Sequence, residues 1–521
     1  MFDLRDYQKD QVNFLKKHIG KDWSMFDSNI SLQSPTGSGK SVTMLTFIKE
    51  YLYDNRYSKV FISTGFNELV FQIAEDAMKM GIPTKILIGK NNMTCAKKVL
   101  SKGYEADEFE AFEKSIPPSL KYDQTQCKYC SIYSDGNCYW QKVVSEIERG
   151  GVLVITNHST YFQHSDLFDK FDGGFIDECQ TFADFYELYK SVNISAKDIY
   201  NIIDTAKNDS KIRKSIELAV VRSSVERGAL TPKALGNLLN MSVTKSTFSR
   251  NETYALADKY NLVATSCDKW LKINDPEADN VFVHPQYEGG YFNGVNIDVF
   301  FDKIQLNKNV CIVSATVDDY TKSILGVQHS YNERNCKITD YSKSSLSMYS
   351  SFDMQSIYDF ISKQTAEHGL VLSTRLDIVN ELKSKRFICG YEIVSNVADL
   401  NPGKRQILVG SKTLFQGVNI QSVGFILINK IPFSRYDDSY KKKMAYFDKL
   451  GRNSYMFYTI PYVTNQLIQC MGRLWRSPGD YGNIAIFDRK ACIKHKSILM
   501  SALSYRDGIK VNWRQESDIK D

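Results

Sequence analysis

Short apolar runs recur along the chain, and turn or charged residues bound each of them. They cover residues 29–33, 60–64, 152–156, 175–177 and 310–316 in the first part of the chain, and 370–374, 407–410, 425–430 and 484–488 in the second. Such runs, rich in Val, Ile and Phe, are typical of strands buried on both faces of a parallel sheet. Helical patterns lie between them; after Lys40, for example, Leu45, Ile48 and Leu52 recur at helical spacing. The alternation predicts an α/β fold with two parallel-sheet lobes.

Two stretches break this rhythm. Residues from about 95 to 140 hold four cysteines and little periodicity, and residues from about 182 to 300 contain long helical patterns followed by an aromatic, Gly-rich piece. Both are predicted to be insertions into the first lobe. The expected division is lobe 1 at 1–94, a cysteine-rich insertion at 95–140, lobe 1 again at 141–181, a mostly helical insertion at 182–280, the last part of lobe 1 at 281–320, and lobe 2 at 321–521.

Composition narrows the class of protein only a little. A length of 521 residues is too great for one hydrophobic core, and the net charge of +6 is compatible with a phosphate backbone as partner without requiring one. Neither a run of about eighteen apolar residues nor an N-terminal leader is present, so we expect a cytoplasmic protein without a membrane span. Eleven cysteines in such a chain indicate a metal site, a cluster or buried thiols rather than disulfides.

The sequence SPTGSGKS, at Ser34–Ser41, follows a predicted strand and opens a predicted helix. This context is typical of a loop that binds nucleotide phosphates through its backbone N–H groups. Lys40 is expected to reach the β and γ oxygens, and the Ser41 hydroxyl to bind Mg²⁺. The residues expected to hold the nucleotide here are Thr36, Gly37, Ser38, Gly39, Lys40 and Ser41. The alternative is a Gly/Ser-rich turn beside a lysine, and Ser34 stands where the strict pattern has glycine.

A second half of an NTPase site follows at Phe175–Glu178, where an apolar strand ends in two acids. Asp177 is placed to hold Mg²⁺ through water, and Glu178 to polarise the attacking water. An acidic pair at a strand end is usually only a solvated terminus. Together with the phosphate loop it predicts ATP hydrolysis.

Three further motifs resemble those of superfamily 2 helicases. Arg5-Asp6-Tyr7-Gln8 resembles the adenine-reading element, with Arg5 and Gln8 as nucleotide contacts, and Ser314-Ala315-Thr316 resembles the element that couples hydrolysis to nucleic-acid grip. The run from Gln469 through Arg473 to Arg476 matches the second-lobe pattern QxxGRxxR. The resemblance implies that Gln469 and both arginines complete the catalytic site from the other lobe. A solvated helix face is the alternative for the arginines.

Within that superfamily the chain resembles the XPD/DinG family, most closely its DinG-like sequences. The segments that carry the resemblance are LIGKNNMTC (87–95), VLVITNHSTYF (152–162), ILVGSKTLFQGVNI with FILINKIPFSRYDD (407–438), and GRLWRSPGDYGNIAIFDRK (472–490). The resemblance covers nearly the whole chain in the family's order. It implies two RecA-like lobes, a small iron–sulphur domain, a mostly helical arch-like insertion, and a 5′→3′ DNA helicase.

Two motifs depart from the family. Cys179-Gln180 follows the acidic pair where the family usually has Ala then His, so the coupling role of that position is in doubt. Gln416 and Asn419 replace two acids of motif V, which removes two charges at that edge of the nucleotide site.

Four cysteines, Cys95, Cys127, Cys130 and Cys138, lie where the family inserts its cluster domain. Four thiolates suit a 4Fe-4S cluster, and they suit structural zinc equally well. Only the position within the family favours iron and sulphur. The aromatic residues Tyr122, Tyr129, Tyr139 and Trp140, interleaved with lysines, either stack bases of the separating strand or pack around the cluster.

The family resemblance also implies a track for one nucleic-acid strand across both lobes. Its expected contacts are Thr64, Asn157 and His158 in the first lobe, and Ser373, Thr374 and Thr413 in the second. Short hydroxyl and amide groups suit phosphate contacts that form and break in each cycle. Each of them also has a plain alternative as a strand-end cap, and His158 as a buried, hydrogen-bonded histidine.

The resulting expectation is an ATP- and Mg²⁺-dependent monomer that acts on single-stranded DNA and forked duplexes, in a bacterial cell or as a viral protein in a host cytoplasm. Two alternatives stay open: a nucleic-acid-stimulated ATPase that remodels without unwinding, and a binding scaffold with a degenerate ATPase site. A fused nuclease is not expected, because the lobes and insertions account for the chain.

Overall fold

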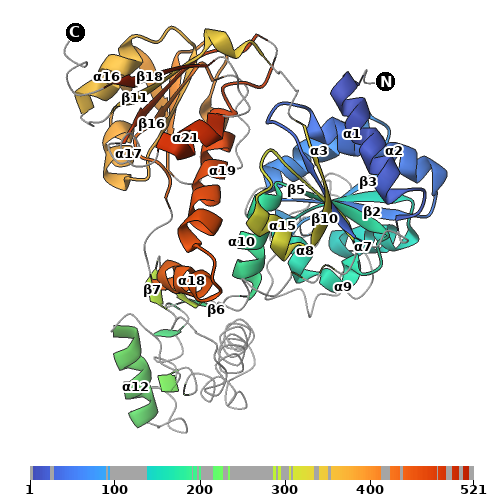
Figure 1. The fold of residues 1–521 in the computed structure, drawn as a ribbon. Coiled ribbons are helices and arrows are strands. Elements are labelled where there is room, and N and C mark those ends of the chain that lie inside the picture. The colour runs from blue at the N-terminus through green and yellow to red at the C-terminus, as the bar shows by residue number, and fades with distance from the viewer. Residues whose placement is uncertain are drawn as a thin grey trace, which may run out of the picture.

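The computed structural model describes a defined part of the 521-residue chain. The described residues are 4–23, 28–89, 92–93, 95, 138–190, 192–195, 197, 199–200, 215–226, 233–234, 237, 286–288, 291–294, 304, 306, 309–333, 339–349, 354–411, 423–433, 438–477, 479–488, 496–503 and 509–514. Figure 1 shows that they form two sheet-based lobes side by side, with further elements below them.

Lobe 1 is built on a parallel sheet of seven strands in the order β10-β1-β9-β5-β2-β4-β3. The strands are β1 (Asn29–Gln33), β2 (Lys59–Thr64), β3 (Thr84–Leu87), β4 (Val152–Asn157), β5 (Gly173–Asp177), β9 (Val310–Ser314) and β10 (Val327–Asn332). Its helices are α1 (Asp6–Ile19), α2 (Lys40–Asp54), α3 (Asn67–Lys79), α7 (Tyr139–Arg149), α8 (His158–Gln163), α9 (Ser165–Phe168), α10 (Cys179–Lys190) and α15 (Asp319–Ile324). The central strands β5 and β9 are buried along their whole length, as their apolar sequences predict.

Lobe 2 is built on an eight-stranded sheet in the order β13-β14-β15-β12-β16-β17-β11-β18. The strands are β11 (Ser345–Tyr349), β12 (His368–Leu372), β13 (Phe387–Ile388), β14 (Tyr391–Val394), β15 (Gln406–Gly410), β16 (Phe425–Ile428), β17 (Asn483–Phe487) and β18 (Lys510–Arg514). All pairs are parallel except β13–β14. Its helices are α16 (Met354–Ser362), α17 (Leu376–Lys383), α18 (Asp438–Lys449), α19 (Ile460–Met471) and α21 (Lys496–Leu503), and a π-helical turn, Tyr455–Thr459, leads into α19. The predicted fold class, two RecA-like parallel-sheet lobes, is confirmed.

A third unit contains α12 (Ser215–Glu226) and a three-stranded antiparallel sheet. Its strands are β6 (Val192–Ser195), β7 (Gln286–Glu288) and β8 (Tyr291–Gly294), in the order β6-β8-β7. In Figure 1 this unit lies below the lobes, with β7 beside α18 and α12 lower down. Most of the cysteine-rich stretch 95–140 lies outside the described residues.

The expected domain boundaries need three corrections. β10 pairs with β1, so lobe 1 reaches at least Asn332 rather than ending at 320. β8 pairs with β6, and β7 pairs with β8, so the third unit extends past 280. The expected boundary at 181/182 falls inside α10, which packs on α8 and β9 of lobe 1. These segments lack apolar runs: β10 is an edge strand with partly or fully exposed side chains, so nothing in its sequence marks it as a strand.

Close packing explains why β5 begins with two glycines. A Cβ atom at Gly173 would lie 2.2 Å from the Trp23 indole, and one at Gly174 would lie 2.5 Å from the Phe61 ring. Both aromatic side chains are almost fully buried in the lobe 1 core. Because core atoms pack at close to crystal density, any larger residue would displace these rings. The strand is thereby held where its last residue, Asp177, meets the phosphate loop.

Candidate nucleotide site between the lobes

The phosphate loop connects β1 to α2, as its sequence predicts. Gly37 and Gly39 have φ angles of +84° and +79°, a region that L side chains rarely adopt. Space is also restricted: a Cβ atom at Gly39 would lie 2.5 Å from Nε2 of Gln8, and one at Gly37 would lie 3.0 Å from the Arg476 carbonyl oxygen. Both glycines are therefore required by the backbone angle and by the close approach of other elements.

The N-terminus of α1 is fastened to this loop. Nε2 of Gln8 donates to the Ser38 carbonyl oxygen at 3.1 Å, and the Tyr7 hydroxyl donates to the same oxygen at 2.9 Å. The Arg5 guanidinium donates to the Tyr7 hydroxyl at 3.0 Å, and the Arg5 backbone N–H donates to Oε1 of Gln8 at 2.9 Å. The structure thus brings the expected adenine-reading element to the phosphate loop, 30 residues away in sequence.

Ser34, which replaces the glycine of the strict pattern, has a role in the loop. Its hydroxyl donates to the Ser38 hydroxyl at 2.7 Å and accepts from Nε2 of Gln11 at 3.1 Å. Lys40 folds back over the loop, where Nζ donates to the carbonyl oxygens of Ser34 and Pro35 at 3.2 and 3.3 Å. The lysine is therefore held at the place where phosphate oxygens would accept the same hydrogen bonds.

Asp177, at the end of β5, is nearly buried, and its Oδ1 has no hydrogen-bond partner within the described chain. Burial and then the charge of Glu178 raise the pKa of Asp177 to about 7, while the charge of Lys40 acts in the opposite direction. An unpartnered buried carboxylate oxygen is costly, so such an atom indicates an absent ligand. The described residues hold no group of three or more His, Cys, Asp or Glu suited to a metal ion. Mg²⁺ is compatible with this site, because it takes one or two protein ligands together with phosphate oxygens and water.

Glu178 is the centre of a hydrogen-bond network that joins the lobes. Its Oε2 accepts from Nε2 of Gln180 at 2.5 Å and from Nε2 of Gln469, on α19 of lobe 2, at 2.6 Å. Oε1 of Gln180 in turn accepts from the Ser314 hydroxyl at 2.5 Å. Glu178 has φ +54°, an uncommon angle for a non-glycine residue, so its surroundings must stabilise the backbone.

The side-chain amide of Gln180 therefore links Ser314, in the element expected to couple hydrolysis to nucleic-acid grip, to Glu178, the expected catalytic acid. It does so with one donor and one acceptor. A histidine offers a comparable pair of groups only in one tautomer, whereas an amide carries both at every pH. The sequence left the role of this position in doubt, and the structure shows that the amide makes both contacts.

The two arginines of lobe 2 lie against the phosphate loop. Arg473 is 3% exposed, and its Nη1 has no hydrogen-bond partner among the described residues. Burial lowers the pKa of Arg473 to about 10. A Cβ atom at Gly472 would lie 2.7 Å from the Thr36 hydroxyl, itself buried without a partner in the described chain. Unpartnered atoms of a guanidinium, a hydroxyl and a carboxylate therefore lie around one loop, and they suit a phosphate and a cation.

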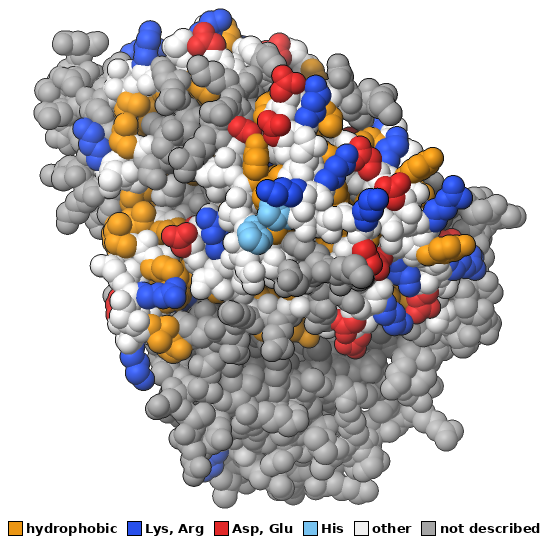
Figure 2. Space-filling model, turned by 45° about the vertical axis from the view of Figure 1, so that its right-hand side comes forward, with side chains coloured by type: hydrophobic (Ala, Val, Ile, Leu, Met, Phe, Trp, Pro, Cys, Tyr) orange, Lys and Arg blue, Asp and Glu red, His pale blue; other side chains and the backbone are white. Residues whose placement is uncertain are grey.

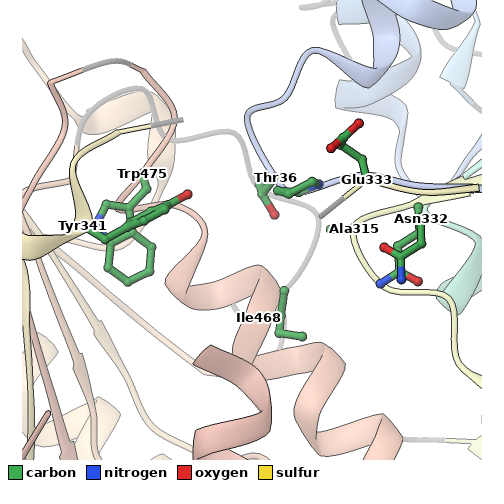
Figure 3. Close-up of a pocket in the computed structure, with 9 residues that line it drawn as sticks. Thr36, Ala315, Asn332, Glu333, Tyr341, Ile468 and Trp475 are labelled. Atoms are coloured by element: carbon green, nitrogen blue, oxygen red, sulfur yellow. The ribbon is translucent and has the colours of Figure 1, made fainter. Parts of the chain in front are cut away.

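A pocket opens between the lobes beside this loop (Figure 3). From lobe 1 it is lined by Gln33, Pro35, Thr36, Ala315, Asn332 and Glu333, and from lobe 2 by Tyr341, Ile468 and Trp475. The sequence did not single out Glu333, which is 5% exposed and accepts from the Tyr331 hydroxyl at 3.0 Å. Glu333 directly follows β10, the edge strand that the apolar pattern did not predict. Both the strand and the glutamate were therefore left out for the same reason, the lack of an apolar run.

The expected nucleic-acid contacts of lobe 1 are largely buried. Thr64 and His158 have no exposed surface, and Nδ1 of His158 lies 2.7 Å from the Ser63 hydroxyl. Burial lowers the pKa of His158 to about 3, although backbone hydrogen bonding at Glu178 and Asp177 acts in the opposite direction. The ring is therefore neutral. His158 packs on Phe182 at 4.9 Å between ring centroids. The structure therefore favours the alternative of a buried, hydrogen-bonded histidine, and the expected contact of His158 with a strand stays a prediction.

Asn157 is partly exposed and caps α8, with Oδ1 accepting from the Thr160 backbone N–H at 2.7 Å. In lobe 2, Ser373 is buried and its hydroxyl accepts from the Arg375 backbone N–H at 3.0 Å, whereas Thr374 is partly exposed. Thr413 and the motif V residues Gln416 and Asn419 lie outside the described residues. Of the expected contacts that the structure describes, Asn157 and Thr374 therefore have surface to offer a strand.

Two of the four expected cluster ligands are described. Cys138 is nearly buried at the start of α7, and the partly buried Cys95 packs against the same lobe 1 core. Cys127 and Cys130 lie outside the described residues, as do Tyr122 and Tyr129. Trp140 is 6% exposed and lies 4.9 Å from the His164 ring, so packing is the correct alternative for this aromatic residue.

The fold and this cleft are typical of a class of protein, the P-loop NTPases in which two RecA-like lobes flank one nucleotide site. Two family models match the chain, the Type III restriction enzyme, res subunit, over residues 1–206 and the Helicase C-terminal domain over residues 335–504. The first covers the phosphate loop and acidic pair, and the second covers Gln469 and both arginines. Each half of the cleft therefore lies within its own family model.

Two curated proteins named DinG are similar to parts of this chain. The chain is 23% identical over 305 residues to the "3′-5′ exonuclease DinG" of Staphylococcus haemolyticus, covering 58% of this chain and 29% of that protein. It is 31% identical over 91 residues to the "ATP-dependent DNA helicase DinG" of Photobacterium profundum, covering 17% of this chain and 13% of that one. The chain thus spans less than a third of the length of either relative.

Among solved structures, one titled "XPD_Helicase" has a TM-score of 0.65 at 16% identity, covering 99% of this chain and all of that one. The S. tokodaii Xpd4 structure has a TM-score of 0.58 at 13% identity, covering 97% of this chain and all of that one. At such identities these structures establish the fold. Together with the family models and DinG relatives, they support a similarity of this chain to the XPD/DinG-like helicases of superfamily 2.

Proposed function

We propose that the protein is an ATP-dependent DNA helicase that moves 5′→3′ on single-stranded DNA and unwinds forked duplexes. The observation that carries this proposal is the Glu178 carboxylate, which accepts hydrogen bonds from Gln180 of lobe 1 and Gln469 of lobe 2. A catalytic acid that both lobes hold makes hydrolysis depend on their relative position. The direction of travel rests on the family resemblance alone.

Each residue of the cleft has a proposed role. Lys40 binds the β and γ phosphates, Ser41 and Asp177 hold Mg²⁺, and Glu178 orients and polarises the attacking water. Arg473 and Arg476 stabilise charge on the γ-phosphate from the other lobe. Gln8 and Arg5 contact the base end, and Thr36, Gly37, Ser38 and Gly39 line the phosphates. The unpartnered atoms of Thr36, Asp177 and Arg473 support this assignment, because a Mg²⁺–nucleotide would satisfy all of them.

We extend the proposal to a 4Fe-4S cluster held by Cys95, Cys127, Cys130 and Cys138, with zinc as the alternative. Cys95 and Cys138 pack on one core, which is compatible with a shared centre but does not choose its metal. Iron and sulphide analysis of anaerobically purified protein separates the two, since zinc protein would contain neither. Substitution of Cys138 by Ser should lower the metal content whichever ion is bound.

The central test is DNA-stimulated ATP hydrolysis. Wild-type protein should hydrolyse ATP faster when single-stranded DNA is added, and Lys40→Ala should lower that rate by at least about 100-fold through the loss of a phosphate-binding charge. A wild-type protein without ATPase activity would instead support the degenerate scaffold.

Strand displacement separates the remaining candidates. We expect a duplex with a 5′ single-stranded tail to be unwound, and the same duplex with a 3′ tail to stay intact. ATP hydrolysis without displacement on either substrate would support the remodelling ATPase. Unwinding of the 3′-tailed substrate alone would overturn the proposed direction. Sedimentation of the protein with and without forked DNA tests the expected monomer.

A further inference from the structure

The contacts between the lobes continue well beyond the nucleotide site, along one side of α10. Gln180, Asp184 and Glu187 are spaced four and three residues apart, so they share one face of this helix. Figure 1 shows α10 on the side of lobe 1 that faces α18 and α19. Gln180 binds Glu178 at the near end, and Glu187 lies about 10 Å further along the helix.

Lobe 2 presents a matching line of residues. Tyr458, in the π-helical turn, is followed on α19 by Tyr462, Asn465 and Gln469, again at helical spacing. Gln469 reaches Glu178 at 2.6 Å, and Nδ2 of Asn465 donates to Oδ2 of Asp318 at 2.8 Å. We call the two lines together the α10–α19 seam.

At the far end of the seam lies a largely buried ion pair. Nζ of Lys443, on α18, lies 3.0 Å from Oε2 of Glu187 and donates to the Tyr458 hydroxyl at 2.8 Å. The side chains of Lys443 and Glu187 are 8% and 21% exposed, whereas those of the Lys170–Glu148 pair on lobe 1 are 57% and 50% exposed. Water and salt screen exposed pairs strongly and buried pairs much less, so the two pairs differ in strength.

Aromatic side chains from both lobes surround this pair. Tyr320 of lobe 1 makes edge contacts with Phe447, Phe457 and Tyr458 of lobe 2 at 5.8, 5.9 and 5.2 Å between ring centroids. Burial by itself lowers the pKa of Lys443, but the charges of Glu187 and other acidic groups outweigh it and the net pKa is raised. The lysine therefore keeps its charge, and losing either partner would leave the other poorly solvated.

We propose that the Glu187–Lys443 pair is an interlobe latch, which holds lobe 2 against α10 in the position that keeps Gln469 at Glu178. Its role in the ATP cycle rests on the proposed function. The position of the pair supports the latch, because α10 begins directly after the catalytic acid and a single residue separates its end from β6 of the third unit. A force on that unit would reach Glu187 and Glu178 through one rigid helix.

The latch is tested by measuring the separation of the lobes without nucleotide. Exposed Met78 on α3 and Lys383 on α17 are replaced by an unnatural amino acid that carries dyes, so the native cysteines stay unlabelled. Single-molecule energy transfer then gives the populations of joined and separated lobes. Lys443→Met should raise the ratio of separated to joined lobes about tenfold, and Glu187→Gln should act in the same direction. Lys170→Met, at the exposed pair, is the control and should leave the ratio unchanged.

The double variant Lys443→Met/Glu187→Gln separates a latch from two independent effects. Its ratio should be no higher than that of either single variant, since each one already removes the pair and the double variant leaves no charge unpaired. Ratios that match wild type in both single variants, or that multiply in the double variant, would overturn the latch. Glu187→Gln keeps the side-chain volume and carries the test if Lys443→Met does not fold.

ATP hydrolysis provides a second readout. The KM for ATP should rise as the joined population falls, because nucleotide must first bring the lobes together, whereas kcat at saturating ATP should stay within about twofold. A kcat that falls with an unchanged KM would argue against the latch. Because energy transfer needs no turnover, a wild-type protein without ATPase activity would refute the proposed function and still leave the latch measurable.

Discussion

The nucleotide cleft and the expected nucleic-acid track are both rich in buried polar side chains, but they use them differently. In the cleft, Thr36, Asp177 and Arg473 bury polar atoms that no other described group satisfies. On the track, Asn157 and Ser373 accept hydrogen bonds from nearby backbone N–H groups, and Oγ1 of the fully buried Thr64 resembles the atoms of the cleft in having no hydrogen-bond partner among the described residues. Since a buried polar atom without a partner is costly, the cleft is organised around a ligand. Asn157 and Ser373 on the track instead stabilise their own strand ends, whereas Thr64 and His158 have no exposed surface.

The surface agrees with this contrast. On the described residues of the face in Figure 2, Lys and Arg side chains are interspersed with Asp and Glu rather than gathered into a stripe. A net charge of +6 therefore does not mark a nucleic-acid path on that face. No described helix is long and apolar enough to span a membrane.

The largest expected effect comes from Glu178→Gln. This change keeps the shape of the side chain and removes its ability to polarise water, so DNA-stimulated kcat should fall by about 100- to 10,000-fold. Affinity for ATP, measured by fluorescence of a nucleotide analogue, should change little. A residual kcat within tenfold of wild type would contradict the assignment of Glu178 as the water-activating acid.

Gln180 should give the next largest effect. Gln180→Ala removes the donor to Glu178 and the acceptor for Ser314, and we expect kcat to fall about tenfold. Gln180→His should restore part of the rate and add a pH dependence, because the imidazole titrates near neutral pH. An unchanged rate in Gln180→Ala, with wild-type melting temperature, would show that the network does not position Glu178.

A substitution of Asp177 should change the stability of the nucleotide-free protein and the binding of nucleotide in opposite directions. The folded-state pKa of about 7 lies above the ordinary value of 3.8, so the folded state holds a proton that the unfolded state loses. Its favourable contribution is complete below pH 4 and is lost as pH rises through 7, by the usual linkage between proton binding and folding. Asp177→Asn should therefore stabilise the nucleotide-free protein above pH 7 by about 1–3 kcal/mol.

The same variant should lose the thermal stabilisation that Mg²⁺ and ATP give the wild type. Thermal unfolding at pH 6 and pH 8, with and without Mg²⁺-ATP, measures both effects. Equal stability of wild type and variant at pH 8 would contradict the raised pKa.

The smallest effect is expected on the track. Asn157→Ala removes the N-cap of α8, which should lower the free energy of unfolding by about 1 kcal/mol. Asn157→Asp keeps an acceptor for the Thr160 N–H and serves as the matched variant. If Asn157→Ala instead left stability intact and weakened DNA-stimulated ATPase activity alone, the side chain would be a nucleic-acid contact rather than a cap.

Much of the cleft could be predicted from the sequence, because each half of it is local. The phosphate loop needs glycines at positive φ between a strand and a helix, and the acidic pair needs only the end of a buried strand. The buried strands β5 and β9 were predictable for the same reason, since burial on both faces demands a continuous apolar run.

Only the tertiary structure could decide how distant parts of the chain meet. Gln469 lies 291 residues from Glu178, and Lys443 lies 256 residues from Glu187. An isolated glutamine or lysine looks the same in sequence whether it is solvated or buried against a partner. The edge strand β10, with the buried Glu333 that follows it, escaped prediction because pairing with β1 defines it rather than an apolar pattern of its own. The sequence by itself thus determined which chemistry the chain carries, and packing of the two lobes decided which side chains hold it in place, because burial and hydrogen bonding depend on contacts that local patterns do not encode.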